Sequence, residues 1–179
     1  MKRALFLTGG PGVGKTTIIK EALALPAEGL ARARVSAGGF YTEEMRSGGV
    51  RQGFKLTTLH GQSTVLAHLD IKSQYRVSKY GVNLEGLEGV GVAAIRQAIQ
   101  DSAVVVIDEV GKMELFSPSC REAVTEALAS GKRVLGTIML APHPWADAIK
   151  RRPEVEVVTV TRANRDQVAG RVRRWLESM

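Results

Sequence analysis

The chain has 179 residues, of which 44% are hydrophobic and 24% charged, and its formal net charge is +7. These proportions are typical of a folded protein and exclude a disordered chain, and the length is that of one domain. No apolar run approaches the roughly 20 residues that cross a bilayer, and the apolar stretch after the basic start is too short for a signal peptide. We therefore expect one domain covering residues 1–179, located in the cytoplasm and without a membrane partner.

The net charge indicates which partners the chain binds, and the cysteine and histidine residues bear on its cellular compartment and on metal binding. A basic chain attracts polyanions, which include nucleotides and nucleic acids. Aromatic residues make up only 5% of the chain, and they do not interleave with the basic clusters, so nucleic acid ranks well behind nucleotides as a partner. The single cysteine, Cys120, cannot form an internal disulfide, which agrees with a reducing compartment, and the three histidines lack metal-ligand spacing.

The first apolar run, residues 4–7, stops at a glycine cluster that opens into a predicted helix over residues 15–25, which Pro26 ends. The spacing Gly9-x-x-x-x-Gly14-Lys15-Thr16 matches the phosphate-binding loop. Glycines let the backbone N–H groups curl around a polyphosphate, and the helix points its free N–H groups and positive dipole end inward. The sequence therefore predicts that a nucleoside triphosphate is bound by Gly9, Gly10, Pro11, Gly12, Val13, Gly14, Lys15, Thr16 and Thr17.

Two of these residues have chemical roles beyond the loop. Lys15 offers a cation to the outer phosphates, and the Thr16 hydroxyl offers an oxygen ligand to Mg²⁺, the predicted cofactor. We assign Lys15 as a catalytic residue and Thr16 as a metal ligand.

An inserted β meander is predicted over about residues 38–69. Two alternating runs, residues 39–46 and 50–59, flank a Gly48-Gly49 turn and indicate an antiparallel hairpin. A further strand follows over residues 63–69.

The remaining segments alternate between strands and helices. Residues 75–85 are irregular, and apolar periodicity predicts a helix over 89–99. The β-branched run over 103–107 predicts a central parallel strand. A helix begins at Ser117-Pro118 and ends at Gly131. A strand over residues 133–140, a loop over 142–145 and a short helix over 146–151 come next. A strand over 155–160 and a closing helix over 164–177 complete the chain. This order predicts an α/β P-loop NTPase fold with a mostly parallel central sheet flanked by helices.

A pair of acids completes the predicted site. Asp108 ends the buried strand, at the carboxyl edge where open α/β sheets bind ligands, and is the second predicted magnesium ligand. Glu109, the other predicted catalytic residue, can polarise a water for attack on the γ-phosphate, which favours hydrolysis over transfer. Thr137, near the end of the next strand, has two interpretations: it faces the γ-phosphate or the water, or it is there for β-propensity alone.

The sequence does not support guanine specificity. Asn164-Arg165-Asp166-Gln167 resembles the guanine-reading pattern Asn-Lys-x-Asp but lacks the lysine and has its acid one place early. We expect Asn164 instead to cap the last helix. The sequence alone leaves three functions open: a triphosphatase, a nucleotide or nucleoside kinase, and an NTPase switch associated with nucleic acid. An arginine that assists catalysis is not identified, the candidates being Arg46, Arg51, Arg76, Arg162 and Arg165.

Motifs along nearly the whole chain resemble the small P-loop nucleoside-triphosphatase family first described from hyperthermophiles, which includes the animal cancer-related nucleoside triphosphatase. The FYTEE hairpin and DEVGKMEL are the specific features. Ser78 and Met139 depart from the family pattern, which has glycine and proline there. The matching stretches are GGPGVGKTT at residues 9–17, GGFYTEEMRSGGVRQGF at 38–54, RVSKYGVNLE at 76–85, VVIDEVGKMELF at 105–116, GTI at 136–138 and TRANRDQV at 161–168.

The resemblance implies a magnesium-dependent triphosphatase of relaxed base specificity that acts on ATP, GTP, CTP, UTP and TTP. It also implies that a second segment binds nucleotide, consisting here of Val105, Val106, Ile107, Asp108, Glu109, Val110, Gly111 and Lys112.

Overall fold

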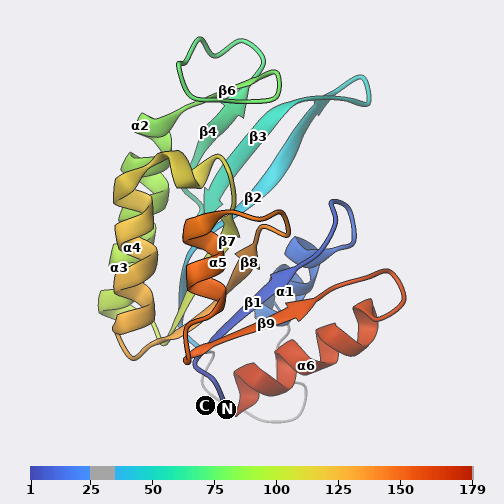
Figure 1. Ribbon diagram of the computed structural model, residues 1–179, viewed down its shortest axis with the longest axis vertical. Coiled ribbons are helices and arrows are strands. Elements are labelled where there is room, and N and C mark those ends of the chain that lie inside the picture. Colours follow the sequence, from blue (N-terminus) through green and yellow to red (C-terminus); the bar gives the residue numbers. More distant parts are fainter. Residues whose placement is uncertain (25–34, 179) are drawn as a thin grey trace.

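The computed structural model describes residues 1–24 and 35–178. Within these residues nine strands form one sheet in the order β5-β6-β4-β3-β2-β7-β8-β1-β9 (Figure 1). The predicted end of the first helix, at Leu25 and Pro26, lies outside the described residues. The strands are β1 (Ala4–Thr8), β2 (Ala37–Ser47), β3 (Val50–Thr58), β4 (Ser63–His68), β5 (Arg76–Val77), β6 (Tyr80–Val82), β7 (Val104–Val110), β8 (Arg133–Ile138) and β9 (Val155–Thr159).

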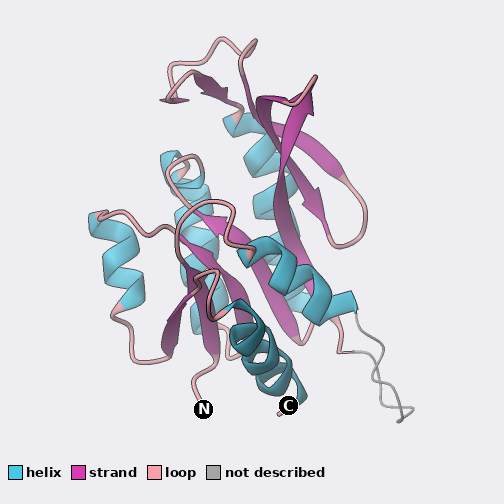
Figure 2. Cartoon of the chain, turned by 90° about the vertical axis from the view of Figure 1, so that its right-hand side faces the viewer, coloured by secondary structure: helices cyan, strands magenta, loops and turns pink. Residues whose placement is uncertain are grey.

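One half of the sheet is parallel and has helices on both faces, as predicted. Strands β2, β7, β8, β1 and β9 pair in parallel. Because side chains alternate along a strand, Phe6 packs into one core while Leu5 and Leu7 pack into the other. Helices α3 (Ala93–Asp101), α4 (Pro118–Ala129) and α5 (Pro144–Lys150) cover the Phe6 face, and α1 (Lys15–Ala24) and α6 (Arg165–Glu177) cover the other (Figure 2).

The other half of the sheet is the predicted antiparallel meander. Residues Ala37 to Phe40 of β2 pair in parallel with β7, and from Phe40 onward the same strand pairs antiparallel with β3. The hairpin turns at Gly48 and Gly49, which both have positive φ. Strand β2 therefore joins the parallel core to the meander, which extends beyond the carboxyl ends of the core strands (Figure 1).

The segment over residues 75–85, predicted to be irregular, contains strands β5 and β6. These strands are only two and three residues long, too short to give an alternating sequence pattern. They form because Tyr80 buries its ring against Phe54 of β3, with the ring centroids 5.3 Å apart.

The helical segment predicted over residues 89–99 begins earlier. A short helix α2 (Leu84–Gly86) is followed by a π-helical stretch (Leu87–Val92) and then by α3. The Asn83 side chain caps the start by accepting the Gly86 N–H at 3.0 Å. Glycines at 86, 89 and 91 conceal this start in the sequence, because glycine disfavours helix.

Two predicted boundaries and one predicted cap differ from the structure for local reasons. Helix α5 starts at Pro144 instead of residue 146, because proline occupies its first turn and His143 Nδ1 accepts the Trp145 N–H. Strand β8 ends at Ile138, and Leu140 beyond it is exposed. Asn164 lies at the start of α6 but makes no side-chain cap, because its Oδ1 accepts the Thr161 N–H instead. None of the helices in the described ranges has the length and apolarity needed to cross a membrane.

Candidate active site

The glycine loop leaves β1 and enters α1 through a tightly curled backbone. Gly9, Gly12 and Gly14 all have positive φ. At Gly9 an added Cβ would lie 2.4 Å from the carbonyl oxygen of Val160, so a side chain is excluded there by space as well as by conformation. The loop is thereby held against the end of β9, and its N–H groups gather at the start of α1.

The Lys15 ammonium folds back over this loop. Its Nζ donates hydrogen bonds of 2.8 Å to the carbonyl oxygens of Gly9 and Gly10. Lys15 is therefore held at the mouth of the loop, where the sequence predicts the outer phosphates.

Asp108 is joined to the glycine-loop helix by hydrogen bonds. Its carboxylate is buried at the end of β7 and accepts the Thr16 hydroxyl at 2.8 Å and the Thr137 hydroxyl at 2.6 Å. The Thr42 N–H of β2 lies 3.4 Å from the same carboxylate. Burial raises the pKa of Asp108, and the Thr137, Thr16 and Thr42 hydrogen bonds and the Lys15 charge counteract it. Thr137 thus positions the carboxylate directly.

The Glu109 side chain is half-buried beside the Asp108 carboxylate and its hydrogen-bond partners. The pairing of β7 with β8 changes register between Ile107 and Val110, so the two acids occupy an irregular stretch of strand. Burial raises the pKa of Glu109, and the neighbouring Asp108 charge raises it further, while the Lys15 charge lowers it. A carboxyl with a raised pKa is a better proton acceptor at neutral pH than an ordinary glutamate, provided that it is ionised.

A third acid, Glu114, lies close to Asp108 and Glu109, and it was not among the site residues predicted from the sequence. It is buried, and its Oε2 accepts the Gly111 N–H at 3.1 Å. Burial raises the pKa of Glu114 well above its ordinary value, and the Glu109 charge adds to the effect. The available sequence signal was a charged residue between Met113 and Leu115 in an apolar stretch.

The base of the β2–β3 hairpin packs against the helix that follows the glycine loop. Glu43 forms an ion pair with Lys20 of α1, and the same ammonium lies 4.6 Å from the centre of the Tyr41 ring. The ion pair raises the pKa of Lys20. These contacts hold the Thr42 backbone beside Asp108, a role that alternation in the sequence could not reveal.

The other residues of the predicted segment 105–112, together with Thr17, differ in how far they are buried. Val105, Val106, Ile107 and Val110 are buried in the core, so their side chains support the position of Asp108. Gly111 is buried in the turn that follows, whereas Lys112 and Thr17 are exposed.

Of the five candidate arginines, Arg165 lies against the glycine loop. Its side chain would be 3.2 Å from a Cβ placed on Gly14. Arg46 and Arg51 lie on the hairpin, and Arg76 and Arg162 are exposed.

Cys120 takes no part in the site. Its thiol is buried in α4, and burial raises its pKa to about 12, so it remains protonated.

A set of parallel strands with a glycine loop after the first strand, joined through a threonine to an aspartate near the carboxyl end of the next-but-one strand, β7, defines an α/β protein of the P-loop NTPase type. The family model described as NTPase matches residues 4–173. The chain is 44% identical over 168 residues to the nucleoside-triphosphatase THEP1 of Thermotoga sp. (strain RQ2), covering 94% of this chain and 92% of that protein. It is 40% identical over 181 residues to the human cancer-related nucleoside-triphosphatase, covering 94% and 93%.

Solved structures agree with this comparison. The crystal structure of THEP1 from Aquifex aeolicus superimposes with a TM-score of 0.82 at 33% identity, covering 97% of this chain and 99% of that one. The solution structure of a human cancer-related nucleoside triphosphatase gives 0.80 at 38% identity, covering 98% of both. The chain belongs to this NTPase family, and the predicted resemblance and fold class are confirmed.

Proposed function

We propose that the chain is a magnesium-dependent nucleoside-triphosphate phosphohydrolase that releases the γ-phosphate of ATP, GTP, CTP, UTP and TTP in the cytoplasm. The observation that carries the proposal is the hydrogen bond from Thr16 to buried Asp108, with half-buried Glu109 directly beside it. The names of the relatives at 40% and 44% identity support the reaction class.

The donor set fits a magnesium ion. Thr16 Oγ1 and Asp108 Oδ2 are 2.8 Å apart. Two neighbouring ligands at 2.0–2.1 Å in an octahedron are separated by roughly 2.9 Å. Hard oxygen donors of this kind, with phosphate oxygens and waters completing the shell, are what Mg²⁺ prefers. When bound, the ion would be held by Thr16 and Asp108 and would neutralise negative charge that develops on the phosphates during the reaction.

The protein residues have separate tasks in this reaction. The loop N–H groups and Lys15 bind the phosphates, for which the Lys15 ammonium exchanges its two carbonyl partners for phosphate oxygens. Thr137 and the Thr42 N–H fix the Asp108 carboxylate. Glu109 orients a water and accepts its proton as the water oxygen attacks the γ-phosphorus and the bond to the β-phosphate oxygen breaks.

Broad base specificity follows from the missing guanine-reading lysine and from the polar loop that Asn164 builds. Asn164 bonds the backbone at Thr161 and Thr159. Its side chain is thereby used within the loop instead of being free to read a base edge. We expect the turnover numbers for the five triphosphates to agree within about tenfold, a spread of about 1.4 kcal/mol.

The test is phosphate release from each triphosphate with Mg²⁺ and with EDTA, for the wild type and for Asp108→Asn. We expect release from all five with Mg²⁺, loss in EDTA, and a decrease of at least about a hundredfold in the variant, as expected when an essential charge-stabilising group is removed. Release that is unchanged by EDTA, or confined to one base, would contradict the proposal.

The same assay separates the two alternatives. A kinase would need an added nucleoside or nucleotide panel before the triphosphate was consumed, and phosphate would appear on that acceptor. A nucleic-acid switch would release phosphate only with added RNA or DNA. We expect free phosphate in the absence of either addition.

A further inference from the structure

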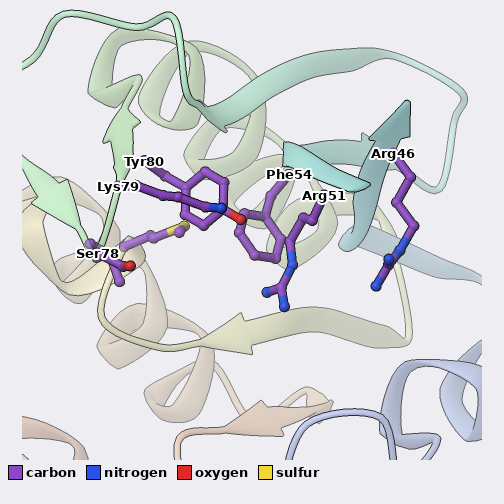
Figure 3. A pocket seen from close by; sticks show the side chains of 8 residues that line it. Arg46, Arg51, Phe54, Ser78, Lys79 and Tyr80 are labelled. Atoms are coloured by element: carbon purple, nitrogen blue, oxygen red, sulfur yellow. The ribbon is translucent and has the colours of Figure 1, made fainter. Parts of the chain in front are cut away.

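A cavity lies on the β2–β3 hairpin, and none of its lining residues belongs to the glycine loop. It has a volume of about 510 Å³, within the range of small-ligand sites. Its walls come from the hairpin, from the turn between β5 and β6, and from Met113 after β7 (Figure 3). The eight lining residues are Arg46, Arg51, Phe54, Val77, Ser78, Lys79, Tyr80 and Met113.

The walls of this cavity carry excess positive charge. Three of its lining residues are cations, Arg46, Arg51 and Lys79, and none is an acid. In the described part of the chain the ion pairs of these cations are with Glu44, at 2.6 Å from Arg46 and 3.5 Å from Arg51. One carboxylate therefore pairs with two of the three cations, and an anionic ligand would supply the missing negative charge.

The two arginines are placed in a way that costs stability without an anion. Arg46 and Arg51 are directly opposite each other in the β2–β3 register, where like charges repel. The Arg51 Nε makes no hydrogen bond among the described residues, because the nearest carboxylate oxygen, Glu44 Oε1, is 3.5 Å away. Its pairing with Glu44 is therefore long and weak, and a ligand that offers oxygen atoms would complete it.

The apolar part of the cavity is aromatic. Phe54 and Tyr80 meet edge to face, and the Arg51 guanidinium lies 5.3 Å from the centre of the Phe54 ring. Figure 3 shows the Arg46 and Arg51 side chains extending from the hairpin in the same direction, with the Phe54 ring beside Arg51 and the Tyr80 ring beyond it. Guanidinium groups and aromatic rings both provide flat surfaces for a planar ring of a ligand.

The turn that closes the cavity has strained backbone. Ser78 has a φ of 54°, and in the described ranges it is the one residue other than glycine with positive φ. Such conformations are unfavourable for residues other than glycine and cluster at ligand sites. In the same turn, the Lys79 ammonium lies 5.8 Å from the centre of the Tyr80 ring.

The cavity lies close to the proposed reaction centre along β2. Thr42, whose N–H faces Asp108, and Glu44, which pairs both arginines, are two residues apart on this strand. Two residues of strand cover roughly 7 Å. The cavity is thus a neighbour of the triphosphate site with its own residues.

We propose that this cavity binds a second, small phosphate-bearing ligand with a planar ring, of the chemical class of a nucleoside monophosphate, while the glycine loop holds a triphosphate. Arg51 and Arg46 bind the phosphate, and Phe54 and Tyr80 bind the ring. The proposal goes beyond triphosphate hydrolysis, because it requires binding only and no turnover.

The test is a calorimetric titration in two steps. The glycine loop is first saturated with Mg²⁺ and a non-hydrolysable ATP analogue, and AMP, adenosine or inorganic phosphate is then added. We expect AMP to bind with one-to-one stoichiometry and adenosine not to bind. Weaker binding of inorganic phosphate than of AMP would support recognition of the ring, and equal binding would overturn that part. Failure of AMP to bind at millimolar concentration would overturn the proposal.

Variants locate the binding. Arg51→Ala should weaken AMP binding by about tenfold or more, because a charge-assisted hydrogen bond is lost. Arg51→Lys should recover only part of the affinity, because lysine lacks the planar fork. The exposed Arg173→Ala on α6 is the matched control for loss of one positive charge and should bind as the wild type does.

Folding and function are checked separately. Circular dichroism melts verify that each variant folds, and Arg46→Ala replaces Arg51→Ala if the latter unfolds. Equal AMP affinity in the wild type and in the folded arginine variant would overturn the proposal. Failure of the first titration step would count against the proposed triphosphate site instead, so the two failures are distinguishable.

Discussion

The two ends of the β2–β3 hairpin differ in how tightly the rest of the molecule holds them. At its base, Phe40 is fully buried, β2 pairs with the core strand β7, and Thr42 contacts Asp108. At its tip, Gly48 and Gly49 face open space. The base is fixed by the same core that holds the proposed reaction centre. The tip is free of that core, which leaves its arginines available to a ligand.

The largest effect on stability is expected at Gly39, in the base. Its φ is 112°, and an added Cβ would lie 2.0 Å from the carbonyl oxygen of Val106. Gly39→Ala should therefore cost about 3 kcal/mol or more, since backbone strain and overpacking each cost roughly 1–3 kcal/mol. Urea unfolding followed by circular dichroism measures this loss.

Gly48→Ala at the tip is the matched control. Gly48 also has positive φ, at 56°, but nothing lies within 4 Å of an added Cβ. Only the conformational cost applies, about 1 kcal/mol. Equal losses in the two variants would contradict the difference between the base and the tip.

The next effect is expected at Thr137. Thr137→Val keeps the shape of the side chain but removes the hydroxyl that donates to buried Asp108 at 2.6 Å. Loss of a hydrogen bond to a charged group should lower the unfolding free energy by about 1.5–3 kcal/mol. Urea unfolding measures this loss, and an unchanged midpoint would show that Asp108 does not depend on Thr137.

A smaller effect is expected where the hairpin meets α1 at the surface. The side chains of Lys20 and Glu43 are 42% and 43% exposed. Exposed ion pairs contribute about 1 kcal/mol or less, so a double-mutant cycle of Lys20→Ala and Glu43→Ala should give a coupling energy below that of Thr137 with Asp108. A larger coupling would show that this contact does more than align the hairpin.

The smallest effect at neutral pH, and one that changes with pH, is expected at Glu114. The folded-state pKa of this carboxyl is raised, so the stability it contributes is full below its ordinary value of 4.5 and is lost as pH rises through the raised pKa. Glu114→Gln keeps the side chain uncharged at every pH. The melting temperature of the variant, relative to the wild type, should therefore be higher at pH 8 than at pH 5. An identical difference at both values would contradict the raised pKa.

The sequence predicted the elements whose patterns are long and local. The glycine loop has a fixed spacing, and the β-branched run before Asp108 predicted a buried strand, so both were located correctly. The Gly48-Gly49 turn likewise located the hairpin. Strands β5 and β6 were missed because their burial against Phe54 is a tertiary contact between short segments.

Three local details could not be predicted, because each depends on the path of the backbone and not on the residue pattern. Glu114 is six residues beyond Asp108, and only the fold turns its carboxyl back toward Gly111. Asn164 has the residue type of a cap, yet its side chain bonds the preceding loop. Ser78 departs from the glycine of the family pattern, and the structure shows that this position has positive φ.

The most direct test of the account is Glu109→Gln under single-turnover conditions. Glutamine retains the size of the side chain but cannot accept a proton, and the exposed Glu85→Gln is the matched control. With excess enzyme and γ-labelled MgATP, we expect nucleotide binding to be retained and phosphate release to slow by about 10²- to 10⁴-fold, the usual contribution of a general base. Release within a few-fold of the wild-type rate would contradict the assignment of Glu109 and with it the proposed hydrolytic mechanism.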